Sequence, residues 1–88
     1  ILFEPAYDSY RPIIEAVGAQ AVPVRLSPPD WRLPVEAIAR AITPNTRVIL
    51  INSPMNPVGR VFSRDELLAL SELAIKHDLR VICDEVYE

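Results

Sequence analysis

Short apolar segments alternate with segments of helical character along the whole chain, and this order constrains the fold more than any other feature. The run at residues 47–51 is rich in β-branched side chains, which is typical of a central parallel strand covered on both faces. Parallel strands need a crossover between them, and that crossover is usually a right-handed helical connection. The sequence therefore predicts an α/β fold with a parallel sheet. The expected strands are residues 1–3, residues 21–26 with Pro23 marking an edge strand, residues 47–51 and residues 80–83.

Three helices are expected to connect these strands. The first starts after Asp8 or Ser9 and ends near Gly18, because a left-handed residue commonly follows the end of a helix. The third starts with a capping box, in which the Ser63 hydroxyl and the Glu66 carboxylate bond to backbone amides. The apolar faces expected for the helices are Ile13, Ile14 and Val17 in the first, Ile38, Ala41 and Ile42 in the second, and Leu67, Leu70, Leu73 and Ala74 in the third.

Composition excludes several classes of function. The chain has 88 residues, half of them hydrophobic, and a formal net charge of −3, as expected for a soluble globular chain of at most one domain. Nucleic acid binding is disfavoured because 12 acidic residues outnumber 9 scattered basic ones. No segment approaches the roughly 20 apolar residues of a membrane span. A single cysteine and no signal peptide favour a cytoplasmic location, and the abrupt start and end indicate a piece of a longer chain.

The common motifs for nucleotide and metal binding are missing from the sequence. Gly18 and Gly59 are the only glycines, so neither a dinucleotide-binding turn nor a phosphate-binding P-loop is present. No His, Cys or acidic cluster has the spacing of metal ligands. We expect His77 to be a solvated or helix-capping side chain, and Cys83 to be a small buried hydrophobic residue and not a nucleophile.

The carboxyl ends of the predicted strands are the place to look for a ligand site. All strands of a parallel sheet point the same way, so the segments that follow them lie along one edge, where ligands of such folds bind. Residues 5–7, 52–59 and 84–87 meet at that edge. An aromatic ring, an amide, a carboxylate and a phenol are therefore expected to converge there.

Three of these segments resemble a known family. Residues 52–59 read N-S-P-M-N-P-V-G and resemble the N-x-P-x-N-P-x-G loop of fold-type I pyridoxal-phosphate enzymes, specifically the class I/II aminotransferases. Residues 84–87 resemble the D-E-x-Y strand end of that family, and residues 4–10 resemble its segment with an aromatic residue on the cofactor ring. The likeness runs along residues 1–88 and is greatest to the kynurenine-, methionine- and succinyldiaminopimelate-type transaminases. It implies a parallel-sheet fragment of the large, cofactor-binding domain of a homodimeric enzyme.

The resemblance implies that pyridoxal 5'-phosphate is held by Tyr7, Asn56, Asp84 and Tyr87. The Asp84 carboxylate would keep the pyridine nitrogen protonated, so that the ring accepts electrons from the substrate. Asn56 and Tyr87 would donate hydrogen bonds to the phenolic oxygen of the ring, and Tyr7 would stack on the face of the ring. Tyr10 is assigned to packing.

The resemblance also implies that residues 1–88 contain no catalytic residue. Transamination needs a lysine amine, and the only lysine is Lys76, on the polar face of the third helix and away from the site edge. In the family, the catalytic lysine follows the D-E-x-Y segment, the main phosphate-binding loop precedes the region of residue 1, and the arginine for the substrate carboxylate lies in the carboxyl-terminal part. The whole enzyme is expected to transfer an amino group between an amino acid and a 2-oxo acid, whereas this chain alone is expected to be inactive.

Three other hypotheses remain open from the sequence. A carbon–sulfur lyase of the same fold typically ends this strand with D-E-I-H, so Tyr87 favours the transaminase. A non-catalytic α/β binding module with Asp84 as a strand-end acid leaves the loop at residues 52–59 without a purpose. The last hypothesis is a truncated, inactive gene product.

Overall fold

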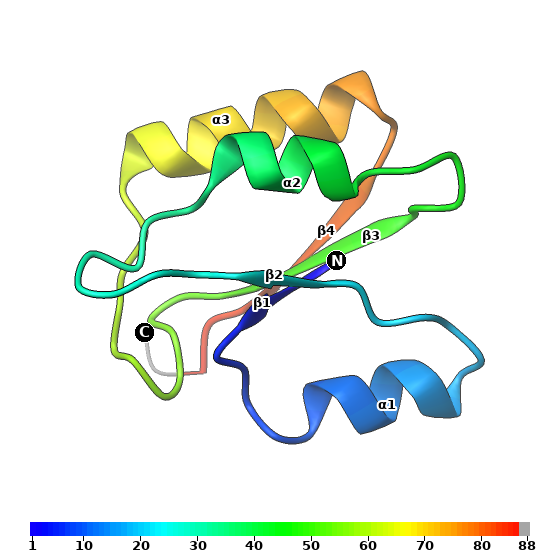
Figure 1. Ribbon diagram of the computed structural model, residues 1–88, viewed down its shortest axis with the longest axis horizontal. Helices are drawn as coiled ribbons and strands as arrows, with labels where there is room; N and C mark the ends of the chain where they lie inside the picture. The colour runs from blue at the N-terminus through cyan, green and yellow to red at the C-terminus, as the bar shows by residue number, and fades with distance from the viewer. Residues whose placement is uncertain (87–88) are drawn as a thin grey trace.

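The structure is a computed structural model that describes residues 1–86. Strands and helices alternate in the predicted order, which confirms the α/β fold (Figure 1). None of the helices in this part of the chain combines the length and the apolar character that crossing a bilayer requires. The elements are β1 (Leu2–Glu4), α1 (Tyr10–Ala16), β2 (Pro23–Arg25), α2 (Val35–Ala41), β3 (Val48–Asn52), α3 (Arg64–Lys76) and β4 (Arg80–Asp84).

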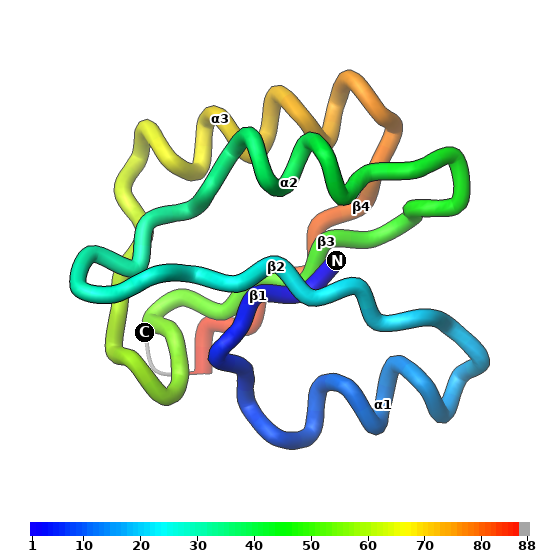
Figure 2. Tube along the Cα trace, viewed as in Figure 1, coloured from blue at the N-terminus to red at the C-terminus, as the bar shows by residue number. Residues whose placement is uncertain are grey.

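Within residues 1–86, four strands form a parallel sheet in the order β2-β1-β3-β4. Helices α2 and α3 lie side by side on one face of the sheet, and α1 lies on the opposite face (Figures 1 and 2). β3 is an inner strand, as its apolar composition predicts. β2 is an edge strand, the position that Pro23 favours because proline lacks a backbone donor.

The main core lies between the sheet and the layer formed by α2 and α3. Ile49 and Ile51 of β3 are only 0% and 2% exposed. They face the same side of the sheet, because every second side chain of a strand points to the same face. They pack in one cluster with Ile38 of α2 and Leu70 of α3. Burying an aliphatic side chain of this size stabilises the fold by about 2 kcal/mol. The buried members of the cluster are Phe3, Val24, Leu26, Leu33, Ile38, Ile49, Ile51, Met55, Phe62 and Leu70.

Helix α3 begins with the predicted capping box. The Ser63 hydroxyl accepts a hydrogen bond from the Glu66 amide, and the Glu66 carboxylate accepts one from the Ser63 amide. Leu70 and Ala74 are buried as predicted. The prediction that Leu67 is buried is wrong, since this side chain is 39% exposed. It lies in the first turn of α3, where the polar contacts of the capping box hold the helix.

Helix α1 packs more loosely than its sequence suggests. It ends as predicted before Gly18, whose φ of +80° is a left-handed conformation that glycine adopts without strain. However, α1 buries none of its residues, and Ile13 and Val17 are 61% and 78% exposed. In the described part of the chain, α1 is the one helix on its face of the sheet, so it has no helical neighbour to cover its flanks (Figure 1).

The prediction that Cys83 is buried is also wrong. β4 has β3 as its sole neighbour within residues 1–86, and the Cys83 side chain is exposed together with Val81 and Ile82. The pKa of the Cys83 thiol is raised by partial desolvation and by the negative charge of Glu85. A raised pKa disfavours the thiolate, which agrees with the prediction that Cys83 is not a nucleophile.

Candidate functional site

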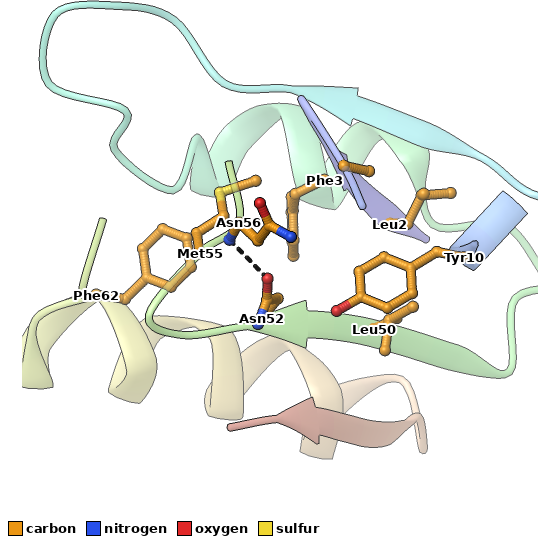
Figure 3. Close-up of a pocket in the computed structure, with 9 residues that line it drawn as sticks. Leu2, Phe3, Tyr10, Leu50, Asn52, Met55, Asn56 and Phe62 are labelled. Atoms are coloured by element: carbon orange, nitrogen blue, oxygen red, sulfur yellow. Dashed lines mark hydrogen bonds between the residues drawn. The ribbon is translucent and has the colours of Figure 1, made fainter. Parts of the chain in front are cut away.

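The candidate site lies at the carboxyl ends of β3 and β4. Asn52 and Asp84 are the last residues of these strands, and the parallel register pairs them directly. Asn56 lies in the loop that follows β3, close to Asn52 (Figure 3). The structure therefore brings the amide of Asn56 and the carboxylate of Asp84 to the same sheet edge, as the topology predicts.

The side chain of Asn52 connects the two segments. Its Nδ2 atom donates to the backbone oxygen of Asp84 at 2.9 Å. Its Oδ1 atom accepts from the backbone nitrogen of Asn56 at 2.8 Å (Figure 3). Asn52 is 6% exposed and is the one buried polar residue in the described part of the chain. Asn52 is the first asparagine of the loop motif at residues 52–59, and the motif alone did not indicate this linking role.

The carboxylate of Asp84 is half-buried and held by two donors. Tyr10 Oη donates to its Oδ2 atom at 2.5 Å, and the backbone nitrogen of Val86 donates to its Oδ1 atom at 3.2 Å. The assignment of Tyr10 to packing alone is therefore wrong. Tyr10 is the first residue of α1, and the amino end of a crossover helix lies at the carboxyl edge of the sheet. The position of Tyr10 at the start of this crossover helix was the feature of the sequence from which its place at the site edge could have been predicted.

Tyr7 lies beside Tyr10 at the same edge. The two rings make an edge-to-face contact, with centroids 5.6 Å apart and an interplanar angle of 77°. Tyr7 is 47% exposed, so one part of its ring is open to a ligand. Tyr7 contacts Tyr10, and Tyr10 in turn bonds to Asp84. The role of Tyr7 in stacking on the cofactor ring stays a prediction.

A small cavity lies between β1, β3 and the loop after β3, and its lining includes Tyr10, Asn52 and Asn56 (Figure 3). Its volume is about 10 Å³, which is room for about one water molecule. A ligand with an aromatic ring therefore does not fit inside it. Such a ligand must lie on the open side of the edge, where Asp84 and Asn56 are partly exposed.

The loop after β3 has its own internal support. The backbone nitrogen of Gly59 donates to the oxygen of Met55 at 2.6 Å, and the nitrogen of Met55 donates to the oxygen of Arg60 at 2.8 Å. Gly59 has a φ of +71°, which side-chain-bearing residues rarely adopt. Met55 is buried in the core at 4% exposure, so it fixes the loop next to Asn56.

An ion pair ties the end of this loop to the helical layer. Arg60 Nη2 lies 2.9 and 2.8 Å from the two carboxylate oxygens of Glu66, and Arg60 Nε donates to the backbone oxygen of Asp30 at 2.9 Å. The Glu66 carboxylate also accepts from the backbone nitrogens of Leu33 and Ser63. Burial acts to raise the pKa of Glu66, but the hydrogen bonds from Ser63, Leu33 and Arg60 outweigh it, so the pKa lies below its ordinary value.

Two further predictions concern Lys76 and Tyr87. Lys76 is the last residue of α3, a helix that starts near the site edge and runs back toward the opposite end of the sheet (Figure 1). The structure thus confirms that Lys76 does not lie at the site. Tyr87 lies outside the described residues, so its role as a hydrogen-bond donor stays a prediction.

The groups at this edge can pair with a cationic group and can donate a hydrogen bond to an oxygen. A carboxylate has about four lone-pair positions, and the two described donors to Asp84 leave acceptor capacity for a cation. The side-chain amide of Asn56 makes no hydrogen bond within residues 1–86, so its donors are available to an oxygen of the ligand. The fold and the site together define an α/β protein whose polar side chains gather at the carboxyl edge of a parallel sheet, the edge at which ligands of such folds bind.

Comparison with known proteins identifies the family. Residues 1–88 match the family "Aminotransferase class I and II", and the chain belongs to it. It is 49% identical over 90 residues to a probable N-succinyldiaminopimelate aminotransferase, DapC, of Mycobacterium tuberculosis, and the match covers 100% of this chain and 23% of that protein. It is 40% identical over 99 residues to a probable kynurenine–oxoglutarate transaminase, BNA3, of Saccharomyces cerevisiae, covering 100% of this chain and 22% of the relative.

Solved structures agree with this result. A Thermus thermophilus aspartate aminotransferase variant superposes with a TM-score of 0.96 at 36% identity, over 99% of this chain and 24% of the other. The fold is therefore that of the fold-type I aminotransferases. The chain spans about a quarter of the length of these relatives.

Proposed function

We propose that residues 1–88 form part of the cofactor-binding domain of a pyridoxal-phosphate-dependent aminotransferase. The whole enzyme moves an amino group between an amino acid and a 2-oxo acid. Membership of the aminotransferase family supports this proposal. The structural observation that carries it is the linkage of Asn56 and Asp84 through Asn52 at one sheet edge. A homodimeric assembly and a cytoplasmic location belong to the same proposal and rest on the resemblance and on the composition of the chain.

The donor set of this edge fits pyridoxal phosphate. The cofactor has a basic ring nitrogen, which needs an anionic partner, and a phenolic oxygen, which needs a hydrogen-bond donor. The Asp84 carboxylate can serve as the anionic partner, and the side-chain amide of Asn56 can serve as the donor. Both groups keep hydrogen-bonding capacity that the other described residues do not use. When bound, pyridoxal phosphate supplies an electron-accepting ring for the charge that develops on the substrate.

Each residue of the chain has a separate task in this proposal. The Asp84 carboxylate holds a proton on the ring nitrogen by pairing with its positive charge. Tyr10 and the amide of Val86 hold that carboxylate in one orientation. Asn56 donates a hydrogen bond to the phenolic oxygen, and the exposed part of Tyr7 is available for stacking on the ring.

The part of the chain that the structure describes places no lysine at the site for proton transfer at the substrate. Lys76 lies at the far end of α3, and no other lysine exists in the sequence. The lysine amine that the reaction requires must therefore come from outside residues 1–88. These residues bind and orient the cofactor, and they leave the proton transfer to other parts of the enzyme.

The proposal is tested with the full-length enzyme that contains this chain. The measurements are the affinity for pyridoxal phosphate and the rate of amino transfer to 2-oxoglutarate from a panel of amino acids. Saturable cofactor binding that Asp84→Asn and Asn56→Ala both weaken, together with measurable amino transfer, is the expected result. Release of ammonia and a thiol from sulfur amino acids without amino transfer would favour the carbon–sulfur lyase. Absence of cofactor binding would overturn the proposal.

A further inference from the structure

We infer that Asn52 is a positioning residue that fixes Asn56 relative to Asp84 across the cofactor site. The inference rests on the proposed function, because it assigns Asn52 a role in aligning two groups that hold the cofactor. Asn52 itself does not need to touch the cofactor. Its task is to make the loop after β3 and the end of β4 behave as one unit.

The side chain of Asn52 is a buried amide whose oxygen and nitrogen both form hydrogen bonds. Asn52 is 6% exposed, and its oxygen and its nitrogen each have a backbone partner on a different segment. A buried amide without partners is costly, whereas a buried amide with partners is tolerated. The buried state of Asn52 is therefore favourable only when the Asn56 loop and β4 are both in their observed places.

The attachment of Asn56 depends on the Asn52 side chain more than the attachment of Asp84 does. The backbone oxygen of Asp84 accepts a second hydrogen bond, from the backbone nitrogen of Ser53 at 3.1 Å, so β4 stays attached without the Asn52 side chain. The bond from the Asn56 nitrogen to Asn52 Oδ1 is the described bond that joins Asn56 to the end of β3. The backbone bonds between Met55, Gly59 and Arg60 are internal to the loop, and the Arg60 side chain attaches the far end of the loop to Asp30 and Glu66, away from Asn56. Loss of the Asn52 side chain is thus expected to disturb Asn56 more than Asp84.

Asparagine is a residue type that can make both contacts at position 52. The position needs one acceptor facing the Asn56 amide and one donor facing the Asp84 carbonyl. An ionised aspartate has two acceptors and no donor, so it would face the Asp84 carbonyl with a repulsive oxygen. A protonated aspartate has one donor and one acceptor, as asparagine does. The Asn52→Asp variant is therefore expected to make both contacts at low pH, where the carboxyl group is protonated. It is expected to lose the contact with the Asp84 carbonyl as the pH rises.

The test compares three variants of the full-length enzyme. Asn52→Ala removes both side-chain contacts, and Asn52→Asp restores them only at low pH. Ser53→Ala is the matched control, because Ser53 Oγ accepts a hydrogen bond from the Phe62 nitrogen and forms none with Asn56 or Asp84 within residues 1–86. The variant keeps the backbone bond from Ser53 to Asp84. The measurements are the dissociation constant of pyridoxal phosphate, the pH midpoint of the absorbance of the bound cofactor, and the thermal midpoint of unfolding.

We expect Asn52→Ala to weaken cofactor binding about tenfold, the change expected when one productive hydrogen bond is lost. Its absorbance midpoint is expected to move in the same direction as that of Asn56→Ala. Asn52→Asp is expected to bind the cofactor like the wild type at low pH and more weakly than the wild type as the pH rises. Ser53→Ala is expected to stay within about twofold of the wild type, since its contact does not link the two segments.

The outcomes separate this inference from the proposed function. If Asn52→Ala lowers the thermal midpoint but leaves the dissociation constant and the absorbance midpoint unchanged, Asn52 has a structural role alone and the inference is overturned. If Asn52→Ala does not fold, Asn52→Asp decides: recovery of binding at low pH supports the inference, and equal loss at every pH overturns it. If Asp84→Asn and Asn56→Ala also leave binding unchanged, the proposed function itself fails.

Discussion

Tyr10 Oη donates a hydrogen bond to Asp84 Oδ2 at 2.5 Å, across a sequence separation of 74 residues. The contact joins the start of α1, on one face of the sheet, to the end of the edge strand β4. Hydrogen bonds to a charged acceptor are shorter and stronger than neutral ones. Tyr10 therefore restricts the orientation of the carboxylate that the proposed function places opposite the ring nitrogen.

The Tyr10→Phe variant of the full-length enzyme tests the importance of this contact. It keeps the ring that packs edge-to-face against Tyr7 and removes the donor to Asp84. We expect the single-turnover rate to fall about tenfold or more, because a hydrogen bond to a charged group contributes about 1.5–3 kcal/mol. The thermal midpoint should fall as well, because the same bond joins α1 to β4 in the fold. A variant with wild-type rates and a lower thermal midpoint would show that Tyr10 stabilises the fold and does not position Asp84.

The Asp84→Asn variant tests the electrostatic role of the carboxylate. An amide keeps the volume and some hydrogen bonds, but it cannot stabilise a positive charge on the ring nitrogen. We expect roughly a hundredfold loss in the single-turnover rate, which corresponds to about 3 kcal/mol. Folding should be affected much less.

Asp78→Asn is the matched control for this charge removal. Asp78 is exposed, lies at the opposite end of α3 from the site, and has a φ of 53°, which asparagine tolerates. The control should retain the wild-type rate. If Asp84→Asn retains that rate too and unfolds more readily, Asp84 is a structural residue and the site assignment is wrong.

The Asn56→Ala variant is expected to reduce the rate less than Asp84→Asn and to change the titration of the bound cofactor. Removing a donor to the phenolic oxygen leaves more negative charge on that oxygen, which stabilises a proton bound nearby. The pH midpoint of the cofactor absorbance should therefore rise. Asn45→Ala, in the exposed turn before β3, serves as control and should leave the midpoint unchanged. A lowered midpoint for Asn56→Ala would contradict the proposed contact.

Local patterns in the sequence were sufficient to predict most of the fold. The β-branched run of β3 and the capping box of Ser63 and Glu66 depend on neighbouring residues alone, so they are visible in sequence. The convergence of Asn56 and Asp84 follows from strand direction, which the crossover rule fixes. These features need no knowledge of how side chains pack.

The features that the sequence did not predict depend on contacts between distant elements. The bond between Tyr10 and Asp84 requires the orientation of α1 on the sheet, which its exposed apolar residues do not determine. The exposure of Cys83 depends on which elements lie beside β4, and an apolar strand pattern does not reveal its neighbours. The role of Asn52 was hidden because an asparagine at a strand end is common in turns.

The stability of the loop after β3 is expected to depend on pH through Glu66. The folded-state pKa of Glu66 lies below its ordinary value of 4.5, because the fold stabilises the ionised carboxylate. Its contribution to stability is fully present above that ordinary value and is lost as the pH falls through the lower, folded-state pKa. Glu66→Gln should therefore cost about 1.5–3 kcal/mol at pH 7, the value of hydrogen bonds to a charged group.

Urea unfolding of the full-length enzyme at pH 7 and at several pH values below 4.5 provides the measurement. The wild type should lose more stability on acidification than Glu66→Gln, so that the two curves approach each other. Glu72→Gln, an exposed substitution on the same helix, should follow the wild type throughout. Parallel curves for the wild type and Glu66→Gln would show that the contacts of Glu66 with Arg60, Leu33 and Ser63 contribute no pH-dependent stability.

Residues 1–88 expressed alone are expected to be inactive and poorly folded. In the structure, Val81 and Ile82 of β4 are 40% and 54% exposed, and α1 buries no residue. Exposed apolar groups on an edge strand favour association with other chains, and a small sheet with uncovered faces buries too little surface to fold cooperatively. We therefore expect aggregation or a broad, non-cooperative melt in circular dichroism, and no amino transfer with added pyridoxal phosphate. A cooperative, monomeric melt would contradict the folding prediction, and a transfer rate that Lys76→Ala abolishes would show that Lys76 supplies the catalytic amine.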